Sequence, residues 1–381
     1  MNSITLLQPP RIVFGNGCAP QCAEYLAQRS VKRVLLLSST PVLPALGAVQ
    51  AALKAHGVEF VLAPPVDSEP TRQMFESILP VARAEKIEGV LGIGGGSVID
   101  VAKLIAALFH GRQTAAEVFG INLLRRRELA LVCLPTTAGT GAEVSPNAIL
   151  LDEADELKKG VVSPQLVPDA AFVDPLLTLS VPPAVTAATG LDALTHCIEA
   201  YANKFAHPMV DLYALQGIKL IAANLVRAVR NGAELEARAA LSLGSLYGGL
   251  CLGPVNTAAV HALAYPLGGR FRIAHGVSNA LLLPQVLRFN LSAAPERYAE
   301  MAVALGVKRH GPALTTAEQG VDFLSQLSRD CGVPQTLSEL NIPRAAIPAM
   351  AQAAMQVTRL LKNNPRPLTV ADAVRIYEAA Y

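Results

Sequence analysis

The chain has 381 residues, of which 51% are hydrophobic and 16% are charged. A chain of this length and composition buries much apolar surface and is predicted to form about two domains, which excludes a disordered protein. The net charge of +2 gives no electrostatic reason to expect nucleic acid or an anionic membrane surface as a partner.

The N-terminal stretch, residues 1–15, has no basic segment and is interrupted by Pro9-Pro10, so it is not predicted to be a secretory signal. No uninterrupted apolar run approaches the roughly 20 residues that cross a bilayer. The six cysteines are scattered and form no CxxC pair, which is typical of reduced thiols. We therefore predict a cytoplasmic protein.

Four apolar runs in the first half of the chain end in small or polar residues. They span residues 31–39, 58–64, 87–95 and 129–137, and helical stretches separate them. Parallel strands need burial on both faces, and helices supply the crossovers between them. The pattern predicts an α/β domain with a parallel, Rossmann-like sheet, whose ligands bind beyond the carboxyl ends of the strands.

The spacing of apolar residues changes after Val181-Pro182-Pro183. From there it is helical nearly throughout, including residues 184–204, 208–230 and 235–265, and strand-like runs almost disappear. We predict an NAD(P)-binding α/β domain of residues 1–180 and an all-helical, metal-binding domain of residues 181–381. The cleft between two domains is the natural place for the reaction.

A glycine-rich segment, GIGGGSVIDVAK (92–103), follows a predicted strand and opens a predicted helix. Its glycines allow close backbone approach, and Ser97 is predicted to cap a helix that begins at Val98. Free N–H groups at such a helix start favour a pyrophosphate. The segment alone leaves the question open, because Ser97 stands where a GxGxxG motif has its last glycine.

A second segment, LPTTAGTGAEVSP (134–146), also follows a predicted strand. It offers hydroxyl groups at Thr136, Thr137, Thr140 and Ser145. A polar turn is the alternative reading, but two such loops after neighbouring strands favour a nucleotide-binding site.

An acid and three histidines in the second half form a possible metal site. Asp192 and His196 are four residues apart, so they share one face of a helix. His261 is predicted near the end of a long helix and His275 beyond a glycine turn. One carboxylate and three imidazoles suit a divalent transition ion. Spacing alone leaves open that each histidine has a structural role.

Four motifs in the chain resemble the iron-containing (group III) alcohol dehydrogenase family and follow the same order: GGGSVIDVAK, PTTAGTGAEVS, GLDALTHCIEAY and HALAYPLGGRFRIAHGVSNALLLPQV. The resemblance spans most of the chain and includes the closing NNPRPLT and IYEAAY. It implies the dehydroquinate synthase-like fold of the iron-dependent alcohol dehydrogenases, an Fe²⁺ ion, NAD or NADP, and a homodimer or larger homo-oligomer. Zn²⁺ is an alternative ion, because it binds N/O ligands more tightly than Fe²⁺.

The resemblance also implies roles for single residues. The metal ligands by motif match are Asp192, His196, His261 and His275. The residues that fall at cofactor-binding positions are Gly95, Gly96 and Ser97 for the pyrophosphate, Thr136, Thr137 and Ser145 in the second loop, and Lys158 near the nicotinamide ribose.

The sequence departs from the family at two positions. Many members have a second histidine, implicated in proton relay, where this chain has Tyr265. A phenol with a pKa near 10 is a poor proton shuttle at neutral pH, so Tyr265 is either a catalytic hydrogen-bond donor or an aromatic that shapes the pocket. NAD-preferring relatives often have an aspartate where Ser39 stands, and its loss makes NADP admissible.

The reaction implied is hydride transfer between a small primary alcohol, or its aldehyde, and a nicotinamide. Within the superfamily, a glycerol dehydrogenase-like or maleylacetate reductase-like enzyme is an alternative. Arg270 and Arg272 raise the hypothesis of an anionic substrate, although surface exposure is the simpler expectation. A metal-dependent hydrolase and a non-catalytic nucleotide-binding protein are alternatives from other classes.

Overall fold

The computed structural model describes residues 3–154 and 157–381. The described residues divide into two compact units. Unit 1 contains residues 3–5, 138–140 and 181–381, and unit 2 contains residues 6–137 and 141–180.

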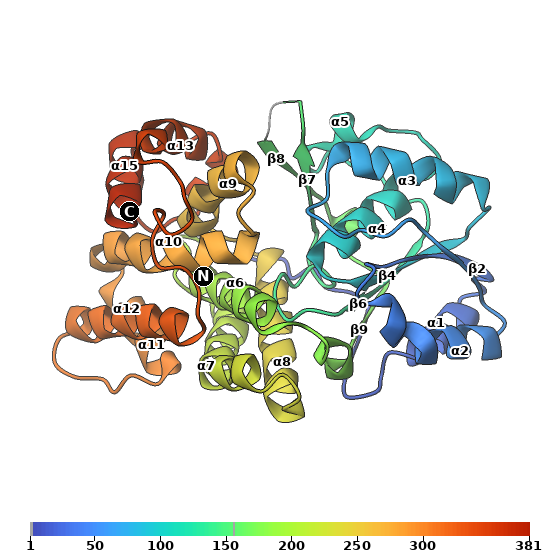
Figure 1. Ribbon diagram of the computed structural model, residues 1–381, viewed down its shortest axis with the longest axis horizontal. Coiled ribbons are helices and arrows are strands. Elements are labelled where there is room, and N and C mark those ends of the chain that lie inside the picture. Colours follow the sequence, from blue (N-terminus) through green and yellow to red (C-terminus); the bar gives the residue numbers. More distant parts are fainter. Residues whose placement is uncertain (1–2, 155–156) are drawn as a thin grey trace. The chain divides into compact units, whose positions relative to one another are not determined.

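Unit 2 is built on a parallel sheet of six strands (Figure 1). Their order across the sheet is β1 (Arg11–Phe14), β9 (Ala170–Val173), β6 (Ala130–Pro135), β4 (Gly89–Gly94), β2 (Arg33–Leu37) and β3 (Glu59–Leu62). The four runs expected to be strands are β2, β3, β4 and β6, so that prediction is confirmed. The edge strand β1 and strand β9 were not predicted.

Both faces of this sheet are covered by helices. Helices α1 (Gln21–Gln28) and α2 (Gly47–Ala55) contribute to one hydrophobic core, and α3 (Arg72–Ala84) and α4 (Gly96–Leu108) contribute to the other. Successive residues of β2 alternate between the cores: Val34 and Leu36 belong to the first, Leu35 and Leu37 to the second. This burial on two sides is why the strands read as continuous apolar runs.

Unit 2 also contains a second sheet, which the sequence did not predict. Its strand order is β5 (Gly120–Ile121), β8 (Leu157–Val162) and β7 (Asn147–Asp152). The short helical elements of the unit are α5 (Ala115–Val118), η1 (Leu43–Leu46), η2 (Pro164–Leu166) and η3 (Pro175–Thr178).

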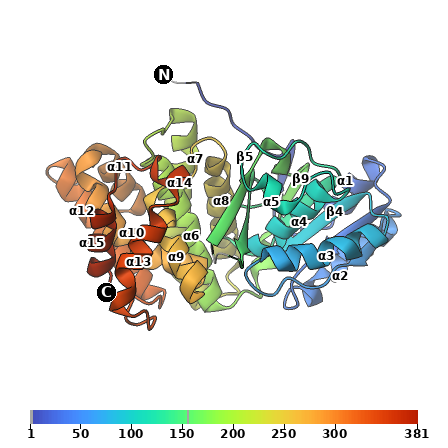
Figure 2. The same ribbon diagram turned by 90° about the horizontal axis from the view of Figure 1, so that it is seen from above.

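The described part of unit 1 is helical, as predicted (Figure 2). Its elements are α6 (Pro183–Tyr201), α7 (Pro208–Arg230), α8 (Leu235–Leu252), α9 (Ala259–Phe271), α10 (His275–Asn290), η4 (Leu291–Ala293), α11 (Pro295–Leu305), α12 (Ala313–Asp330), η5 (Arg344–Ala346), α13 (Ile347–Ala354), α14 (Thr358–Leu361) and α15 (Val370–Ala379). They share one hydrophobic core.

The prediction of one long helix at residues 235–265 is wrong. Helix α8 ends at Leu252 and α9 begins at Ala259. Pro254 in the break has no backbone N–H to donate, and Asn256 has a φ of +65°. His261 therefore lies in the first turn of α9 rather than near the end of a long helix.

One helix among the described residues, α7, is long and apolar enough to cross a membrane by length and composition alone. One third (33%) of its most apolar window is buried, and it packs against α6 and α8. A helix that packs in a protein core passes the same test, so this finding is weak evidence for a membrane span.

Candidate active site

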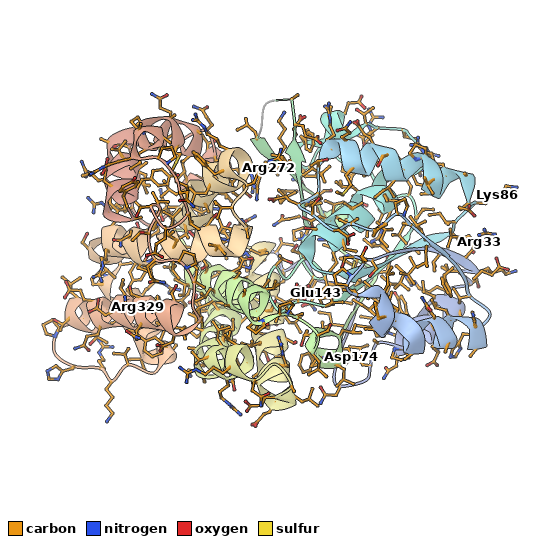
Figure 3. All side chains as sticks on the ribbon, viewed as in Figure 1. Arg33, Lys86, Glu143, Asp174, Arg272 and Arg329 are labelled. Carbon is orange, nitrogen blue, oxygen red and sulfur yellow. The ribbon has the colours of Figure 1, made fainter. Side chains whose placement is uncertain are left out.

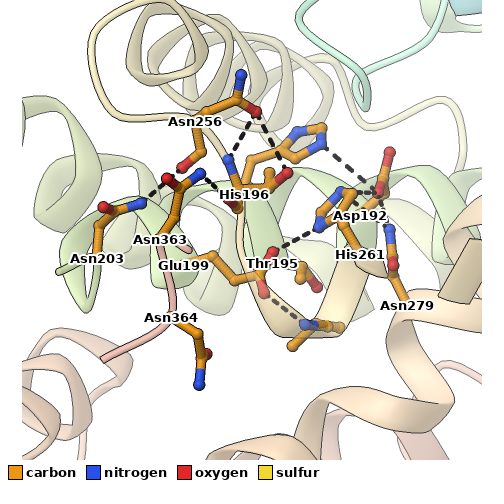
Figure 4. Close-up of polar contacts among 12 residues, drawn as sticks. Asp192, Thr195, His196, Glu199, Asn203, Asn256, His261, Asn279, Asn363 and Asn364 are labelled. Atoms are coloured by element: carbon orange, nitrogen blue, oxygen red, sulfur yellow. Dashed lines mark hydrogen bonds and ion pairs between the residues drawn. The ribbon is translucent and has the colours of Figure 1, made fainter. Parts of the chain in front are cut away.

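Helix α6 places Asp192 and His196 on one buried face, with His196 Nε2 3.8 Å from Asp192 Oδ1. Two further imidazoles reach the same carboxylate oxygen from other helices, and Figure 4 shows that of His261 beside Asp192. His261 Nε2, from α9, lies 3.5 Å from Asp192 Oδ1, and His275 Nε2, from the first residue of α10, lies 3.6 Å away. The structure thus brings all four predicted ligands together.

The separations of His261 and His275 from Asp192 fit a metal ion, whereas His196 lies slightly farther from Asp192, at 3.8 Å. A tetrahedral ion with ligands at about 2.0–2.2 Å has ligand atoms about 3.3–3.6 Å apart. The ligand atoms of Asp192, His261 and His275 lie within 4.8 Å of one another. The side chains of Asp192, His196 and His261 are at most 6% exposed, whereas that of His275 is 30% exposed. Solvent therefore reaches the cluster beside His275.

Close helix packing holds the four side chains of the cluster in place. Gly276 follows His275, and a Cβ atom there would lie 2.1 Å from the backbone oxygen of Ala188 on α6. On α8, a Cβ atom at Gly248 would lie 3.3 Å from the Cβ atom of His196. Glycines at these two positions let α8 and α10 approach α6 closely.

Glu199 is a buried site residue that the sequence analysis missed. Its Oε2 lies 2.6 Å from His261 Nδ1, and its Oε1 accepts a hydrogen bond of 2.6 Å from the backbone N–H of Val260. A carboxylate on Nδ1 leaves Nε2 free to bind an ion. The available signal was helical spacing, because Glu199 follows His196 by three residues on the same face of α6.

The charges of the cluster depend on one another. Burial disfavours the charged form of His261, but Glu199 and Asp192 outweigh it and raise the pKa of His261 to about 10. Burial lowers the pKa of His196 to about 4. Burial also opposes ionisation of Asp192, yet His196 and His275 hold the pKa of its carboxyl well below the usual range. The carboxylates thus attract positive charge into the cluster.

Asn279 is a second residue that the sequence analysis missed. Its Nδ2 lies 2.7 Å from Asp192 Oδ1, 3.1 Å from His261 Nε2 and 3.2 Å from His275 Nε2. Its Oδ1 is buried and has no hydrogen-bond partner among the described residues. Asn279 lies one helical turn after His275 on α10, so the spacing argument used for Asp192 and His196 would also have found it.

Tyr265 lies one turn after His261 on α9. Its ring centroid is 6.2 Å from that of His275, and its hydroxyl accepts a hydrogen bond of 2.7 Å from Arg359 Nη2. The structure therefore places Tyr265 beside His275, the most exposed of the four clustered side chains. Its hydroxyl proton remains available to a further acceptor.

Arg270 and Arg272 are both exposed. Arg270 lies over the ring of its neighbour Phe271, and Arg272 ends α9 with a left-handed φ of +56° (Figure 3). Surface exposure, the simpler expectation, is what the structure shows. The hypothesis that they bind an anionic substrate finds no support in their contacts.

The two predicted cofactor loops meet in unit 2. A Cβ atom at Gly95 would lie 3.4 Å from Thr137 Oγ1, and the N–H of Thr136 donates to Gly94 O at 3.0 Å. Helix α4 begins at Gly96 with Gly95 as its N-cap. The expectation that Ser97 caps a helix from Val98 is therefore wrong, because Ser97 already lies inside the first turn.

Other predicted cofactor residues have partners within unit 2. Lys103 Nζ donates to the carbonyl oxygen of Ser145 at 2.8 Å and to its Oγ at 3.3 Å, so buried Ser145 ties the second loop to α4. Lys158 forms an ion pair with Glu69, and its side chain is only 3% exposed. Ser39 is half-buried just beyond β2. No contact among these residues identifies a cofactor, so their assignment stays a prediction.

Comparison with known proteins decides the family. Residues 9–175 match the family model described as iron-containing alcohol dehydrogenase. Residues 186–381 match the model described as the C-terminal part of the Fe-containing alcohol dehydrogenase family. The chain belongs to the iron-containing alcohol dehydrogenase family. It is an NAD-dependent oxidoreductase that interconverts alcohols and aldehydes, and iron is its metal.

Individual relatives agree with this membership. Long-chain-alcohol dehydrogenase 1 of Geobacillus thermodenitrificans is 38% identical, with 100% of this chain and 98% of that protein covered. The 1,3-propanediol dehydrogenase of Klebsiella pneumoniae is 36% identical, with coverage of 86% and 85%. A crystal structure of a 1,3-propanediol oxidoreductase has a TM-score of 0.96 at 33% identity and covers 100% of both chains. The predicted iron-dependent alcohol dehydrogenase fold is confirmed.

Proposed function

We propose that this alcohol dehydrogenase acts on small primary alcohols and their aldehydes at an Fe²⁺ ion held by Asp192, His196, His261 and His275. The observation that supports the ligand set is the convergence of three Nε2 atoms on Asp192 Oδ1, at 3.8, 3.5 and 3.6 Å. When bound, the ion supplies Lewis acidity that favours the ionised form of an alcohol and polarises an aldehyde.

The side chains around the ligands have separate tasks. Glu199 fixes the ring of His261 so that Nε2 faces the cluster. Asp192, His196 and His261 are buried, and the exclusion of bulk water around them strengthens their electrostatic interactions. Tyr265 lies on the accessible side and can donate its hydroxyl proton in a hydrogen bond to a substrate oxygen.

The cofactor site proposed for NAD lies in unit 2, at Gly95, Gly96, Ser97, Thr136 and Thr137. The backbone N–H groups that open α4 lack intrahelical partners and favour a pyrophosphate there. NAD supplies the hydride acceptor for alcohol oxidation. The proposed roles of Ser39, Ser145 and Lys158 rest on the family resemblance.

The ligand set is tested by replacing His261 with alanine and, as a matched control, His310, which lies outside the cluster. Metal content and absorbance at 340 nm are measured for a panel of primary alcohols after loading with Fe²⁺. We expect His261→Ala to lose metal and activity, and His310→Ala to keep both. Full metal content in His261→Ala would refute the ligand set. Stoichiometric iron in the native enzyme without an absorbance change on any alcohol would refute the substrate class.

We further propose a cytoplasmic enzyme that assembles as a homodimer or larger homo-oligomer. The six cysteines are buried and free, which suits a reducing compartment. Phe205, Met209 and Leu212, at and just before the start of α7, are 51%, 50% and 74% exposed, an apolar surface that assembly would cover. Sedimentation equilibrium tests this, and a monomer at micromolar concentration would contradict it.

A further inference from the structure

The carboxyl end of β2 lies beside the glycine loop that follows β4. The two strands pair in parallel, with Leu37 opposite Gly92, and Ser38 Oγ donates a hydrogen bond of 2.7 Å to Ile93 O. Ligands of open parallel sheets bind beyond the carboxyl ends of the strands. A dinucleotide whose pyrophosphate lies at Gly95 therefore has its adenosine ribose within reach of the residues that follow β2.

A carboxylate from another strand is fixed at this position. Asp67 follows β3, and its Oδ1 and Oδ2 accept hydrogen bonds from the backbone N–H and the hydroxyl of Thr40, at 2.7 and 2.6 Å. The N–H of Val66 donates to Ser38 O at 3.0 Å, which holds the segment before Asp67 against the end of β2. The carboxylate of Asp67 thus lies next to Ser39 although it comes from a different part of the chain.

Asp67 is exposed, and its oxygens retain acceptor capacity because each uses one lone pair on Thr40. The same hydrogen bonds lower the pKa of its carboxyl, so it is ionised at neutral pH. The segments 38–46 and 63–71 contain Asp67 and Glu69 and no lysine, arginine or histidine. Glu69 is paired with Lys158, whereas no ion pair among the described residues involves Asp67. A 2′-phosphate carries a charge of about −2 and would be repelled by the carboxylate of Asp67.

We propose that Asp67 selects NAD over NADP by accepting hydrogen bonds from the adenosine ribose hydroxyls and repelling a 2′-phosphate. It supplies from the loop after β3 the carboxylate that Ser39 lacks at the end of β2. This inference rests on the proposed cofactor site at Gly95. It reverses the expectation from sequence that Ser39 makes NADP admissible.

The test uses two probes that differ only in the group concerned, ADP-ribose and 2′-phospho-ADP-ribose, titrated by calorimetry into the full-length enzyme. Asp67→Asn keeps an acceptor for the N–H of Thr40 and removes the charge. We expect this variant to bind the 2′-phosphorylated probe at least about tenfold more tightly than the native enzyme, and ADP-ribose within about threefold of the native affinity. The NADPH to NADH ratio of kcat/KM should rise by a similar factor.

Glu59→Gln is the matched control, because Glu59 starts β3 and its charge lies at the amino end of that strand, whereas Asp67 follows its carboxyl end. It should leave the preference between the probes unchanged. Asp67→Ser repeats the test with a smaller uncharged residue should asparagine alter the loop. An unchanged preference in both Asp67 variants would overturn the role of Asp67 while the cofactor site stands. Failure of the native enzyme to bind either probe would overturn both the role of Asp67 and the proposed cofactor site.

Discussion

Glu199 Oε2 lies 2.6 Å from His261 Nδ1, and both groups are buried. Each carboxylate oxygen has its own donor, because Oε1 accepts from the N–H of Val260. Glu199→Gln cannot satisfy both donors, since one oxygen becomes an NH₂ group. We expect the variant to bind Fe²⁺ or Zn²⁺ about 10- to 100-fold more weakly in a chelator competition assay.

Thr195→Val is the control for Glu199→Gln. Thr195 is buried on the same helix, and its hydroxyl donates to the backbone oxygen of Leu191. Its loss should leave metal affinity unchanged. Equal metal affinity in Glu199→Gln and the native enzyme would show that Glu199 does not position His261.

Asn279 places an NH₂ group 2.7 Å from Asp192 Oδ1. Asn279→Asp would put two carboxylates in contact, which repel each other in the metal-free protein. We expect the metal-free variant to be less stable than the native protein by about 1–3 kcal/mol. We also expect added Zn²⁺ to raise the unfolding temperature of the variant by more than that of the native protein. Thermal unfolding with and without the ion measures both effects. The same metal-induced shift in both proteins would contradict this role.

Gly276→Ala brings a Cβ atom to 2.1 Å from Ala188 O, a backbone atom that cannot rotate away. The start of α10 must shift, and His275 shifts with it. We expect a loss of stability of about 1–3 kcal/mol or more, together with weaker metal binding. Gly47→Ala is the comparison, because Gly47 has a helical φ of −53° and nothing within 4 Å of a Cβ atom there. Gly47→Ala should be neutral or stabilising.

Tyr265→Phe removes the hydroxyl that meets Arg359 and keeps the aromatic ring. If the hydroxyl donates to the substrate, kcat/KM for aldehydes should fall about tenfold, while the KM for NADH should not change. A variant with native kcat/KM would show that Tyr265 only shapes the site.

Glu143 is a buried acid of unit 2 whose pKa burial raises from 4.5 to about 7, against the opposing effect of Lys103 (Figure 3). Below pH 4.5 the acid is neutral in both the folded and the unfolded chain. As the pH rises to about 7, only the unfolded chain loses the proton, so Glu143 lowers the free energy of unfolding over this range.

Glu143→Gln should remove that loss of stability. The free energy of unfolding of the variant should exceed that of the native protein increasingly between pH 4.5 and 7, by up to roughly 3 kcal/mol. Urea unfolding at several pH values measures the difference. Buried Asp100, whose pKa is also raised, is present in both proteins and cancels in the comparison. A difference that does not vary with pH would contradict the prediction.

Much of the fold could be predicted from apolar runs and helical spacing in the sequence. The strands β2, β3, β4 and β6 could be predicted because burial on both faces demands continuous apolar residues. Helices α6 and α7 were readable from helical spacing. The break between α8 and α9 was missed because Pro254 and Asn256 stand inside a strongly apolar stretch.

The sequence alone determined the types of side chain and their spacing on single elements, which placed Asp192 and His196 on one face of a helix. The family resemblance of its motifs, rather than spacing, grouped His261 and His275 with them. Helical spacing offered Glu199 and Asn279 as candidates, but only the tertiary structure decided which side chain each one touches, since Glu199 reaches His261 from a different helix. It likewise decided that Asp67 lies beside Ser39, 28 residues earlier in the chain. Helical and strand periodicity constrain contacts along one element, whereas contacts between elements depend on how the chain packs.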